Sequence, residues 1–566
     1  MQKECAVCKQ LAIVSARIST DNQYVVAPLC QSCLTRISRK TKMRKEMNCM
    51  KIRNTMRILS LMLAVLLLFP SCSQTEIHSG EENGATSEGT VQEHNAEIEP
   101  AEEEPEGNGR SEVPDSLPPD LDFEGAEIRV FCRAGDRDTE MEFIADDMTG
   151  DVVNDAVFQR NAAVQDRLNV GMTVLPDISL NRHMGADVKI RTSVRAASDD
   201  YDLIANAMYS TMPLITENMF LPLNTLDYLD FSSPWYNPVF LEASGINGNV
   251  YAVMGDLAQS MISGSFVMFF NKTLLDEYFK GEINLYETVL EGRWTLDEMT
   301  SLCGQIYTDA NGNSEADEGD VFGHFFTNTL TLGADSFYGG AKLSFFLKDE
   351  DGSYVYNGCS ERMILFTEKM HKLLFENNNT LLTPDNGDQI MDSMIGRHAV
   401  FTTWMLGGID YLREMEDDFG IIPMPKLDEA QDINTAYAHD GSSAFTIPVT
   451  EQNPAMIAAF LEAMSAESYR TVTPAYFETA IKVKYSRDSE TAKMLDMVVS
   501  GIYLDFSYIF GQSLVTTGTP IDIVRKLLSG STECENAASA LAKVEKASNS
   551  NANRIMKQYM KLKGGE

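Results

Sequence analysis

The chain has 566 residues and a formal net charge of −37, with 83 acidic and 46 basic side chains. Hydrophobic residues make up 44% and charged residues 23%, as in globular proteins, and the length is enough for two or three domains. Because a nucleic-acid binder needs a basic surface, this charge balance argues against that class.

The N-terminal segment 1–49 contains two CxxC pairs, made by Cys5, Cys8, Cys30 and Cys33. Four thiolates at this spacing suit tetrahedral zinc in a reducing compartment. Residues 50–71 then have a basic start and an apolar run that is too short to span a bilayer and is typical of a signal peptide. Because a signal peptide begins a chain, we expect translation to start at Met50 or Met56, with residues 1–49 absent from the mature protein. The alternative is a cytosolic zinc ribbon followed by an uncleaved membrane anchor.

The segment that ends at Cys72 resembles a lipobox, the site at which bacterial lipoproteins are cut and lipidated. Ser71 fits the small residue of that motif, whereas Phe69 and Pro70 depart from it. We expect a lipid anchor on Cys72; the alternative is a cysteine that merely follows an export signal. Residues 73–122 are rich in Glu and poor in apolar side chains, which predicts a solvated acidic tether.

The folded part begins near Gly125 with alternating strand and helix patterns. Strands are expected at 126–135, 170–176 and 201–208, and helices at 154–168 and 186–198. This alternation predicts an α/β fold with a mainly parallel sheet. Since ligands of such sheets bind outside the carboxyl ends of the strands, Tyr209 and Ser210 are expected at the edge of a cleft.

Residues 309–320, DANGNSEADEGD, resemble an EF-hand calcium loop. Its oxygen-bearing side chains would be Asp309, Asn311, Asn313, Asp317 and Asp320. Ser314 replaces the usual glycine, and Asp320 is shorter than the usual final glutamate. We expect a structural calcium site; the alternative is a solvated acidic turn.

Residues 398–426 organise the second half of the chain. A strand is expected over 398–406, a turn at Gly407-Gly408, a helix over 409–418 and extended structure over 419–425. Upstream, Thr295 and Glu298 predict a helix-capping box, which makes Trp294 a structural residue rather than a ligand platform.

Four cysteines are scattered through the folded part: Cys132, Cys303, Cys359 and Cys534. We expect buried free thiols that behave as small hydrophobic side chains. Two disulfides of unknown connectivity are the alternative.

Six ordered segments between residues 126 and 515 resemble the carbohydrate-type extracellular solute-binding proteins of ABC importers (family 1). They are YDLIANAMYS, GINGNVYAVMGD, MFFNKTLLDEYF, GRWTLDEM, DDFGIIPMPKLDEAQ and TPAYFETAIKVKYSRDSETAKMLDMV. The resemblance implies a two-lobe, periplasmic-binding-protein-like fold (type II) over residues 123–566, with three crossings and a ligand cleft between the lobes. It implies a first lobe of about 123–263 and 405–438, and a second lobe of about 268–398 and 443–566.

We found no catalytic motif such as GxSxG, HExxH, a P-loop or GxGxxG in the sequence. A sugar site instead needs flat aromatic side chains for the C–H faces and polar groups for the hydroxyls. The candidates are Tyr209, Ser210, Trp235, Asp256, Trp404, Tyr437, Asp440 and Tyr476. Trp404, before the Gly-Gly turn, is the strongest of them. Each aromatic has a place in the core as its alternative, and Asp440 has a turn-capping role.

The resemblance implies a non-enzymatic protein on the outer face of the bacterial cytoplasmic membrane. It would capture a sugar or oligosaccharide and deliver it to the permease subunits of an importer, whose ATPase lies on the far side. No cofactor is required on this reading. Two alternatives remain: a secreted carbohydrate-active enzyme, and a membrane-anchored solute sensor with a cytosolic zinc ribbon.

Overall fold

The computed structural model describes residues 109–134, 142–177, 185–246, 248–327, 331–376, 380–383, 388–413, 415–477, 489–516 and 518–562. Residues Glu102–Glu566 form one compact unit, separate from Met1–Ala101. The predicted zinc ligands Cys5, Cys8, Cys30 and Cys33, the signal peptide 50–72 and Cys72 lie outside the described residues.

The first sheet has four strands in the order β13-β3-β1-β2. They are β1 (Ala126–Arg133), β2 (Val170–Asp177), β3 (Leu203–Ala207) and β13 (Ser443–Thr446). β1 pairs in parallel with β2 and β3, and β13 adds to β3 in the antiparallel direction. Every residue of β3 is buried, as expected for a strand that reads as a continuous apolar run.

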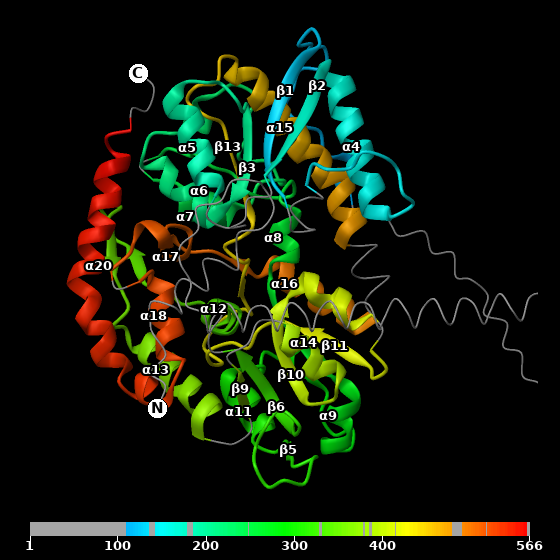
Figure 1. Ribbon diagram of the computed structural model, residues 1–566, viewed down its shortest axis with the longest axis vertical. Coiled ribbons are helices and arrows are strands. Elements are labelled where there is room, and N and C mark those ends of the chain that lie inside the picture. Colours follow the sequence, from blue (N-terminus) through cyan, green and yellow to red (C-terminus); the bar gives the residue numbers. More distant parts are fainter. Residues whose placement is uncertain are drawn as a thin grey trace, which may run out of the picture. The chain divides into compact units, whose positions relative to one another are not determined.

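Helices connect and cover these strands in the predicted βαβ pattern. They are α4 (Val152–Leu168), α5 (Ala186–Ala196) and α6 (Met208–Ile215). Asp151 caps α4 by accepting hydrogen bonds from the backbone N–H groups of Val153 and Asn154. α4 packs against α15 (Pro454–Glu467), and α5 packs against α6. Figure 1 shows these helices on either side of the strands.

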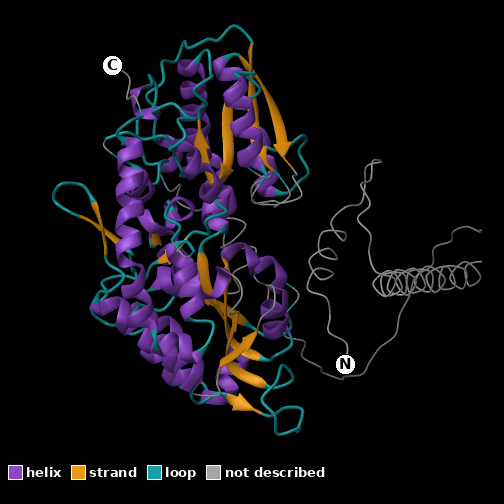
Figure 2. Cartoon of the chain, turned by 60° about the vertical axis from the view of Figure 1, so that its left-hand side comes forward, coloured by secondary structure: helices purple, strands orange, loops and turns teal. Residues whose placement is uncertain are grey.

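The second sheet has six strands in the order β11-β4-β10-β6-β5, with β9 also pairing with β6. They are β4 (Phe266–Asn271), β5 (Tyr307–Thr308), β6 (Val321–Thr327), β9 (Thr380–Thr383), β10 (Ala399–Met405) and β11 (Phe419–Ile422). β10 runs parallel to β6 and antiparallel to β4. The surrounding helices are α9 (Lys272–Phe279), α10 (Leu285–Leu290), α11 (Leu296–Cys303), α12 (Thr331–Gly340), α13 (Glu361–His371) and α14 (Asp388–Ile395), the last two separated by the π-helix η3 (Lys372–Glu376). Figure 2 separates the strands of the unit from the helices around them.

The strand pairing corrects the predicted lobe boundaries. Residues 405–438 were expected in the first lobe, but β11 pairs with β4 in the second sheet. Residues from 443 onward were expected in the second lobe, but β13 pairs with β3 in the first sheet. The predicted return at 398–404 was wrong for the same reason, since β10 lies between β4 and β6. Strand propensity fixes the conformation of a segment but not its partner, which a non-local pairing decides.

The chain enters the second sheet through α8 (Gln259–Ser263), as predicted for the first connection. It returns between β11 and β13, passing through the short strand β12 (Ala436–Tyr437), which pairs with β14 (Ile502–Tyr503). Farther along, α15 packs on α4, whereas α16 (Ser489–Ser500) packs on β11.

The C-terminal helices contact elements on the sides of both sheets. They are α17 (Phe506–Ile509), α18 (Pro520–Leu527), α19 (Ser531–Glu535) and α20 (Ala537–Tyr559), with the 3-10 turn η7 (Gly511–Ser513) between the first two. α17 contacts α6 and α7 (Pro238–Ser244), and α18 packs on α12. α20 packs on the hairpin strand β8 (Tyr354–Tyr356), whose partner is β7 (Phe346–Lys348).

The acidic tether ends earlier than the sequence predicts. Residues 110–112 form a short 3-10 turn, η1 (Arg110–Glu112). Asp115 accepts two hydrogen bonds of 2.7 Å from Arg167 and one of 2.8 Å from Arg470. These three residues, here called the Asp115 cluster, fix the segment to α4 and to the π-helix η5 (Ser468–Val472). The tether was predicted from its scarcity of apolar side chains. That criterion missed the ordered end of the segment, because ion pairs hold it in place.

Several local predictions are confirmed and one is corrected. Trp294 is buried and its Nε1 donates to the Pro423 carbonyl at 2.9 Å, a structural role. Thr295 caps α11 as predicted. The helix expected over 409–418 is instead a 3-10 helix, η4 (Leu406–Leu412), because it follows the strand directly and its glycines pack closely on neighbouring groups. The four cysteines within the described part are free thiols, and Cys359 differs from the prediction in being exposed.

Candidate ligand-binding site

The carboxyl ends of β1 and β3 and the start of β13 meet at one edge of the first sheet. Ser443 lies opposite Ala207, and Cys132 lies opposite Ala205. This edge is the place at which open α/β sheets bind their ligands. The polar residues gathered there, described below, are called the strand-end site.

Ser260, on α8, joins three separate segments at this edge. Its backbone N–H and its hydroxyl both donate to Glu142 Oε1, at 3.2 and 2.5 Å. The backbone N–H of Ser443 donates to the Ser260 hydroxyl at 2.8 Å. The hydroxyl of Ser442 donates to the Ser260 carbonyl at 2.8 Å. The connection into the second sheet is therefore tied to the connection that returns from it.

Two buried charged residues, Arg133 and Glu142, lie beside these Ser260 hydrogen bonds. Arg133, the last residue of β1, is 4% exposed and donates from Nη2 to the Gly441 carbonyl at 2.7 Å. Glu142 has no exposed surface. Burial raises the pKa of Glu142 to about 7, against the opposing effects of the Ser260 hydrogen bonds and the positive charge of Arg133.

Two buried oxygens at this edge have no hydrogen-bond partner among the described residues. They are Asn206 Oδ1 and Gln259 Oε1. The side chains of Glu142 and Ser443 interact with each other. A buried polar atom left unpaired costs roughly 1–3 kcal/mol. Both amide oxygens accept hydrogen bonds only, so their chemistry suits a ligand that brings O–H or N–H donors.

Two hydrogen bonds of the Asp440 backbone fix the position of this residue. Its N–H donates to the Tyr508 hydroxyl at 3.2 Å, and its carbonyl accepts from the Tyr209 N–H at 3.1 Å. The Asp440 side chain is 19% exposed and lies 3.6 Å from His439 Nδ1. A carboxylate on such a fixed backbone is suited to orient ligand hydroxyls.

A buried ion pair supports Tyr508 from the side of the second sheet. Tyr508 donates to Asp335 Oδ2 at 3.4 Å, and Arg525 donates to both oxygens of Asp335 at 2.8 and 2.6 Å. Asp335 lies on α12 and has no exposed surface. Tyr508 therefore links α12, α17 and the segment that carries Asp440.

The structure brings some of the predicted site residues to this edge. Tyr209 and Ser210 follow β3 directly, and Ser210 accepts a hydrogen bond from Asn206 at 2.8 Å. Tyr437 lies close by but is fully buried, stacked on Tyr508 with ring centroids 4.1 Å apart. Its hydroxyl donates to Asp505 at 3.0 Å. Tyr437 therefore supports the site from the core and offers no open ring face.

Trp404 lies at the carboxyl end of β10 and is partly buried. Its ring covers Gly408, where an added Cβ would lie 2.2 Å from Trp404 Cδ1. This packing explains why the turn carries a glycine. Trp404 and the buried Tyr476 contribute to the same core cluster.

Trp235 and Asp256 lie beside Tyr469 and Arg110, not among the residues of the strand-end site. Trp235 is 1% exposed and its ring packs against Tyr469. Asp256 pairs with Arg110 at 3.0 Å, and the guanidinium of Arg110 lies 4.5 Å from the centre of the Tyr469 ring. Burial raises the pKa of Asp256 to about 6, and the charge of Arg110 opposes that shift. These two residues hold the start of the folded chain.

The site residues that the sequence did not reveal come from outside the recognised segments. They are Arg133, Glu142, Ser260, Asp335, Tyr508 and Arg525. Arg133 ends a predicted strand, which was the one usable signal, because strand ends line the site. Nothing in the sequence marks Glu142 or Asp335 among so many acids.

The predicted calcium loop connects β5 to β6. Asp309 accepts from the N–H groups of Gly312 and Ser314, and Asp320 accepts from the N–H of Ala310. Asn311 and Asn313 donate from their amides to Asp317 at 2.8 and 2.6 Å. Ser314 has a φ of 63°, the left-handed conformation that favours the usual glycine. The loop thus folds around its oxygen side chains, a donor set that suits calcium.

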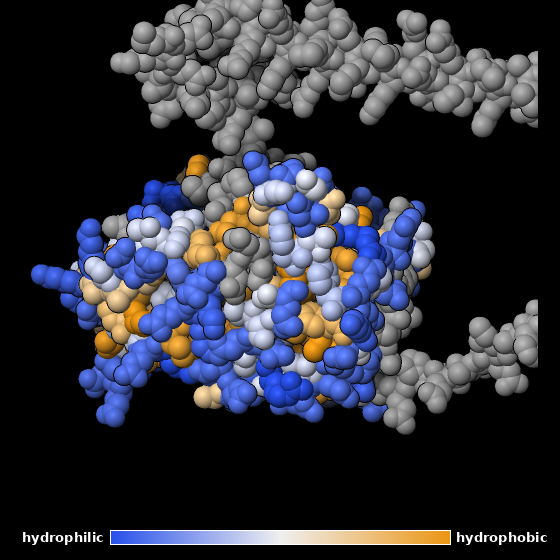
Figure 3. Space-filling view, turned by 90° about the horizontal axis from the view of Figure 1, so that it is seen from below, coloured by the Kyte–Doolittle hydropathy of each residue, from blue (hydrophilic) through white to orange (hydrophobic). Residues whose placement is uncertain are grey.

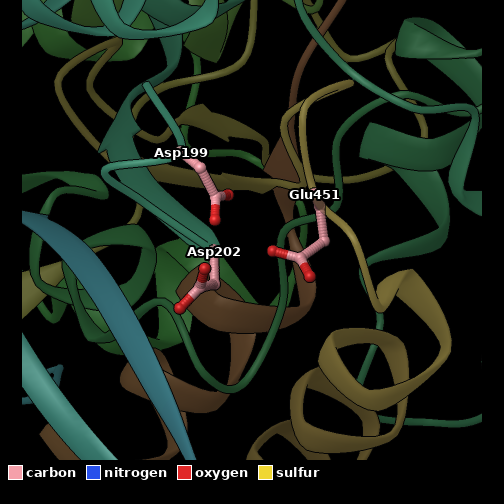
Figure 4. A group of neighbouring side chains, drawn as sticks. All are labelled: Asp199, Asp202 and Glu451. Atoms are coloured by element: carbon pink, nitrogen blue, oxygen red, sulfur yellow. The ribbon is translucent and has the colours of Figure 1, made fainter. Parts of the chain in front are cut away.

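A carboxylate group that could hold a cation lies elsewhere on the first sheet. Asp199, Asp202 and Glu451 point toward one another in Figure 4, each with an oxygen within 4.8 Å of the others. Arg129 already occupies this group, donating from Nε to Asp202 at 3.0 Å and lying 3.2 Å from Asp199. Burial, followed by the charges of Asp202 and Asp199, raises the pKa of Glu451 to about 7. Arg129 therefore supplies the positive charge that a bound cation would otherwise bring to these carboxylates.

Two surface cavities are lined by described residues, and the second includes Phe143, the chain neighbour of Glu142. One of about 400 Å³ is lined by Glu277, Tyr278, Arg397 and His398 beside the 309–320 loop. The other, of about 270 Å³, is lined by Phe143, Phe158 and Met172 among others. On the face drawn in Figure 3, hydrophobic surface is interspersed with hydrophilic surface.

Comparison with known proteins establishes the fold. No family model and no curated protein matches the chain. The lacto-N-biose-binding protein of an ABC transporter from Bifidobacterium longum is similar in structure, with a TM-score of 0.52 and 12% identity over 76% of this chain and 98% of that chain. A cyclo/maltodextrin-binding protein complexed with maltotetraose is similar with a TM-score of 0.50 and 13% identity, over 77% and 98%.

These likenesses confirm the predicted α/β, periplasmic-binding-protein-like fold. Among the described residues, no helix is both long and apolar enough to cross a membrane.

Proposed function

We propose that the protein is the substrate-binding component of an ABC importer that captures a sugar or oligosaccharide. The observation that carries this proposal is the strand-end site: buried oxygens without protein partners lie at the ligand-binding edge of this fold. The two similar proteins with TM-scores of at least 0.50 are named for binding disaccharides or maltodextrins. Hydroxyl-rich ligands bring the O–H donors that these oxygens need.

The proposed mechanism is binding followed by closure. Asn206, Gln259 and Asp440 would accept hydrogen bonds from ligand hydroxyls, and Tyr209 and Trp404 would cover the apolar faces of the ligand. Closure about the segments tied by Ser260 would bury the ligand and present the closed shape to the permease subunits. The protein itself would neither consume ATP nor change its ligand chemically.

The proposed location is the outer face of the cytoplasmic membrane. The signal-like segment 50–71 and the lipobox before Cys72 support export and lipid anchoring. Residues 1–49 would then be absent from the mature protein, and Cys5, Cys8, Cys30 and Cys33 would hold zinc only in a longer form. N-terminal sequencing of the native protein separates these forms, because a chain beginning at Met1 would favour the membrane sensor.

The loop 309–320 is proposed as a structural calcium site that stiffens the β5–β6 connection. Asp309, Asn311, Asn313, Asp317 and Asp320 would supply the oxygen ligands. Calcium would act on stability and would leave the ligand-binding edge unchanged.

A thermal-shift screen against mono- and oligosaccharides tests the proposed function. A ligand that binds the folded state alone raises the unfolding midpoint by mass action. We expect one class of sugar to raise it in the native chain, and to do so less in the Asp440→Asn variant. No shift across a broad panel would contradict sugar binding. Release of new reducing ends from the same sugars would instead favour the alternative of a carbohydrate-active enzyme.

A further inference from the structure

The exposed face of the C-terminal helix α20 is basic, in a chain that is strongly acidic overall. This helix carries one acidic residue, Glu545, against four exposed basic side chains along its length and a fifth just beyond its end. The five are Lys543, Lys546, Arg554, Lys557 and Lys561. The whole sequence has the opposite balance, with 83 acidic and 46 basic residues.

Helical spacing places all five on one line. At about 100° per residue they fall within an arc of roughly 80°. The buried residues of the helix, which include Leu541, Ser548 and Tyr559, fall on the opposite side. From Lys543 to Lys561 the line is about 27 Å long at 1.5 Å per residue. The five residues are here called the basic stripe.

The stripe is not neutralised within the described part of the chain. Its four lysines appear in no ion pair there, and Arg554 donates to a neutral group, the Ser513 carbonyl, at 2.8 Å. Glu545 lies off the stripe by its helical position and acts on Tyr356 and Cys359 of the neighbouring hairpin region. Figure 1 shows α20 (red) at the outer side of the helices that it packs on.

We propose that the basic stripe of α20 docks the protein on an anionic lipid membrane surface. This step rests on the proposed location at the membrane but not on the identity of the solute. A straight ridge of cations on a convex helix meets a flat surface along its whole length. Each basic side chain near an anionic bilayer contributes about fivefold to binding.

Charge complementarity also sets the orientation. The acidic excess over the rest of the molecule is repelled by an anionic surface, so attraction is confined to the side that carries α20. A lipid anchor at Cys72 would raise the local concentration of membrane, so a weak surface contact would be enough to hold this orientation.

Vesicle flotation tests the proposal with the compact unit Glu102–Glu566, which lacks the anchor, so that any binding comes from its surface. The probes are phosphatidylcholine vesicles with and without one part in three of phosphatidylglycerol. We expect binding to the anionic vesicles alone, at low salt, and release as salt rises.

Two double variants with equal charge change make the test specific. Lys546→Gln/Lys557→Gln should lower the partition coefficient about 25-fold. The control Lys280→Gln/Lys493→Gln changes two exposed lysines, one just after α9 and one on α16, and should leave the partition coefficient unchanged. Unfolding midpoints and sugar shifts should be the same in both variants, which separates this proposal from the proposed function.

Three results of the vesicle test would overturn the proposal. They are equal binding to neutral vesicles, no binding to anionic vesicles at low salt, and equal losses in the two double variants. Retention on a soluble polyanion such as polyglutamate without vesicle binding would also overturn it, and would indicate an acidic macromolecule as the partner.

Discussion

Two clusters of buried charged residues lie beside the first sheet, and they differ in how their carboxyl groups are paired. In the Asp115 cluster, one carboxylate with a 3% exposed side chain is bound by two arginines. At the strand-end site, Glu142 is fully buried, and burial outweighs its hydrogen bonds to Ser260 and Ser443 and the charge of Arg133. The first cluster pairs its carboxylate with two positive charges, which is what stability requires. The second holds a buried carboxyl beside amide oxygens that have no partner among the described residues.

The pKa values of Asp115 and Glu142 are shifted in opposite directions. Burial would raise the pKa of Asp115, but hydrogen bonds and charge from Arg167 and Arg470 outweigh it and hold that pKa well below its ordinary value of 3.8. For Glu142 burial wins and the pKa rises to about 7. The carboxyl of Asp115 is therefore favoured as an anion, and that of Glu142 is favoured in its protonated form.

The largest expected effect comes from breaking the Asp115 cluster. Asp115→Asn should lower the free energy of unfolding by about 2 kcal/mol at pH 7, because it removes charge-assisted hydrogen bonds from two arginines. Chemical denaturation would measure this change. Since the native pKa of Asp115 is depressed, its contribution is present above pH 4 and declines as the pH falls further.

The exposed Asp120→Asn is the matched control for Asp115→Asn and should have little effect on unfolding. Sugar affinity should stay the same in both variants. A loss of affinity in Asp115→Asn at unchanged stability would contradict the division between the two clusters.

The next largest effect should come from Asp440, on binding rather than folding. Asp440→Asn keeps the shape of the side chain but weakens its acceptance of ligand hydroxyls. We expect affinity for the sugar found in the screen to fall about tenfold, equal to about 1.4 kcal/mol. Isothermal titration calorimetry measures this, and Asp428→Asn, at a partly buried carboxylate that pairs with Arg362, serves as control. Unchanged affinity would remove Asp440 from the site.

Glu142→Gln should change the pH dependence of folding. In the native chain, the contribution of Glu142 to stability is greatest below pH 4.5, falls as pH rises from 4.5 to about 7, and is then constant. The glutamine variant should lack this slope, so its stability relative to the native chain should rise steadily from pH 4.5 to about 7. Thermal unfolding across that pH range would show it, and parallel curves for the two proteins would contradict a buried, protonated Glu142.

Calcium should give the smallest effect. At free calcium of three times the Kd, binding to the 309–320 loop adds about 0.8 kcal/mol to the free energy of unfolding. Asp317→Asn should abolish this gain, and the solvent-exposed Asp351→Asn on the β7–β8 turn should retain it. A calcium response that persists in Asp317→Asn would place the ion elsewhere.

The sequence predicted the local elements of the first sheet well, because each strand and helix there has a clear period and a clear end. Its α4 has a polar cap at Asp151, and β3 is a continuous apolar run. Residues 405–446 were placed in the wrong lobes. Their strands are short and buried on both faces, so only the partners they meet in the fold decide which sheet they join.

The site was predictable where it follows a strand and hidden where it does not. Tyr209 and Asp440 were chosen from the sequence because they adjoin a strand end or a connection between the lobes, and their role in binding stays a prediction. Glu142 and Ser260 were missed, since their role depends on a contact between residues 118 positions apart in the chain. Trp235 and Tyr437 were chosen as aromatic, but a ring in a sequence carries no sign of whether it will be buried.

A crystal structure with the sugar that gives the largest thermal shift tests the central claim most directly. The account predicts the sugar at the strand-end site, within hydrogen-bond distance of Asp440 and of at least one of the buried amide oxygens of Asn206 and Gln259. A sugar bound instead in the cavity beside Tyr278 and His398, with the strand-end site unchanged, would contradict it.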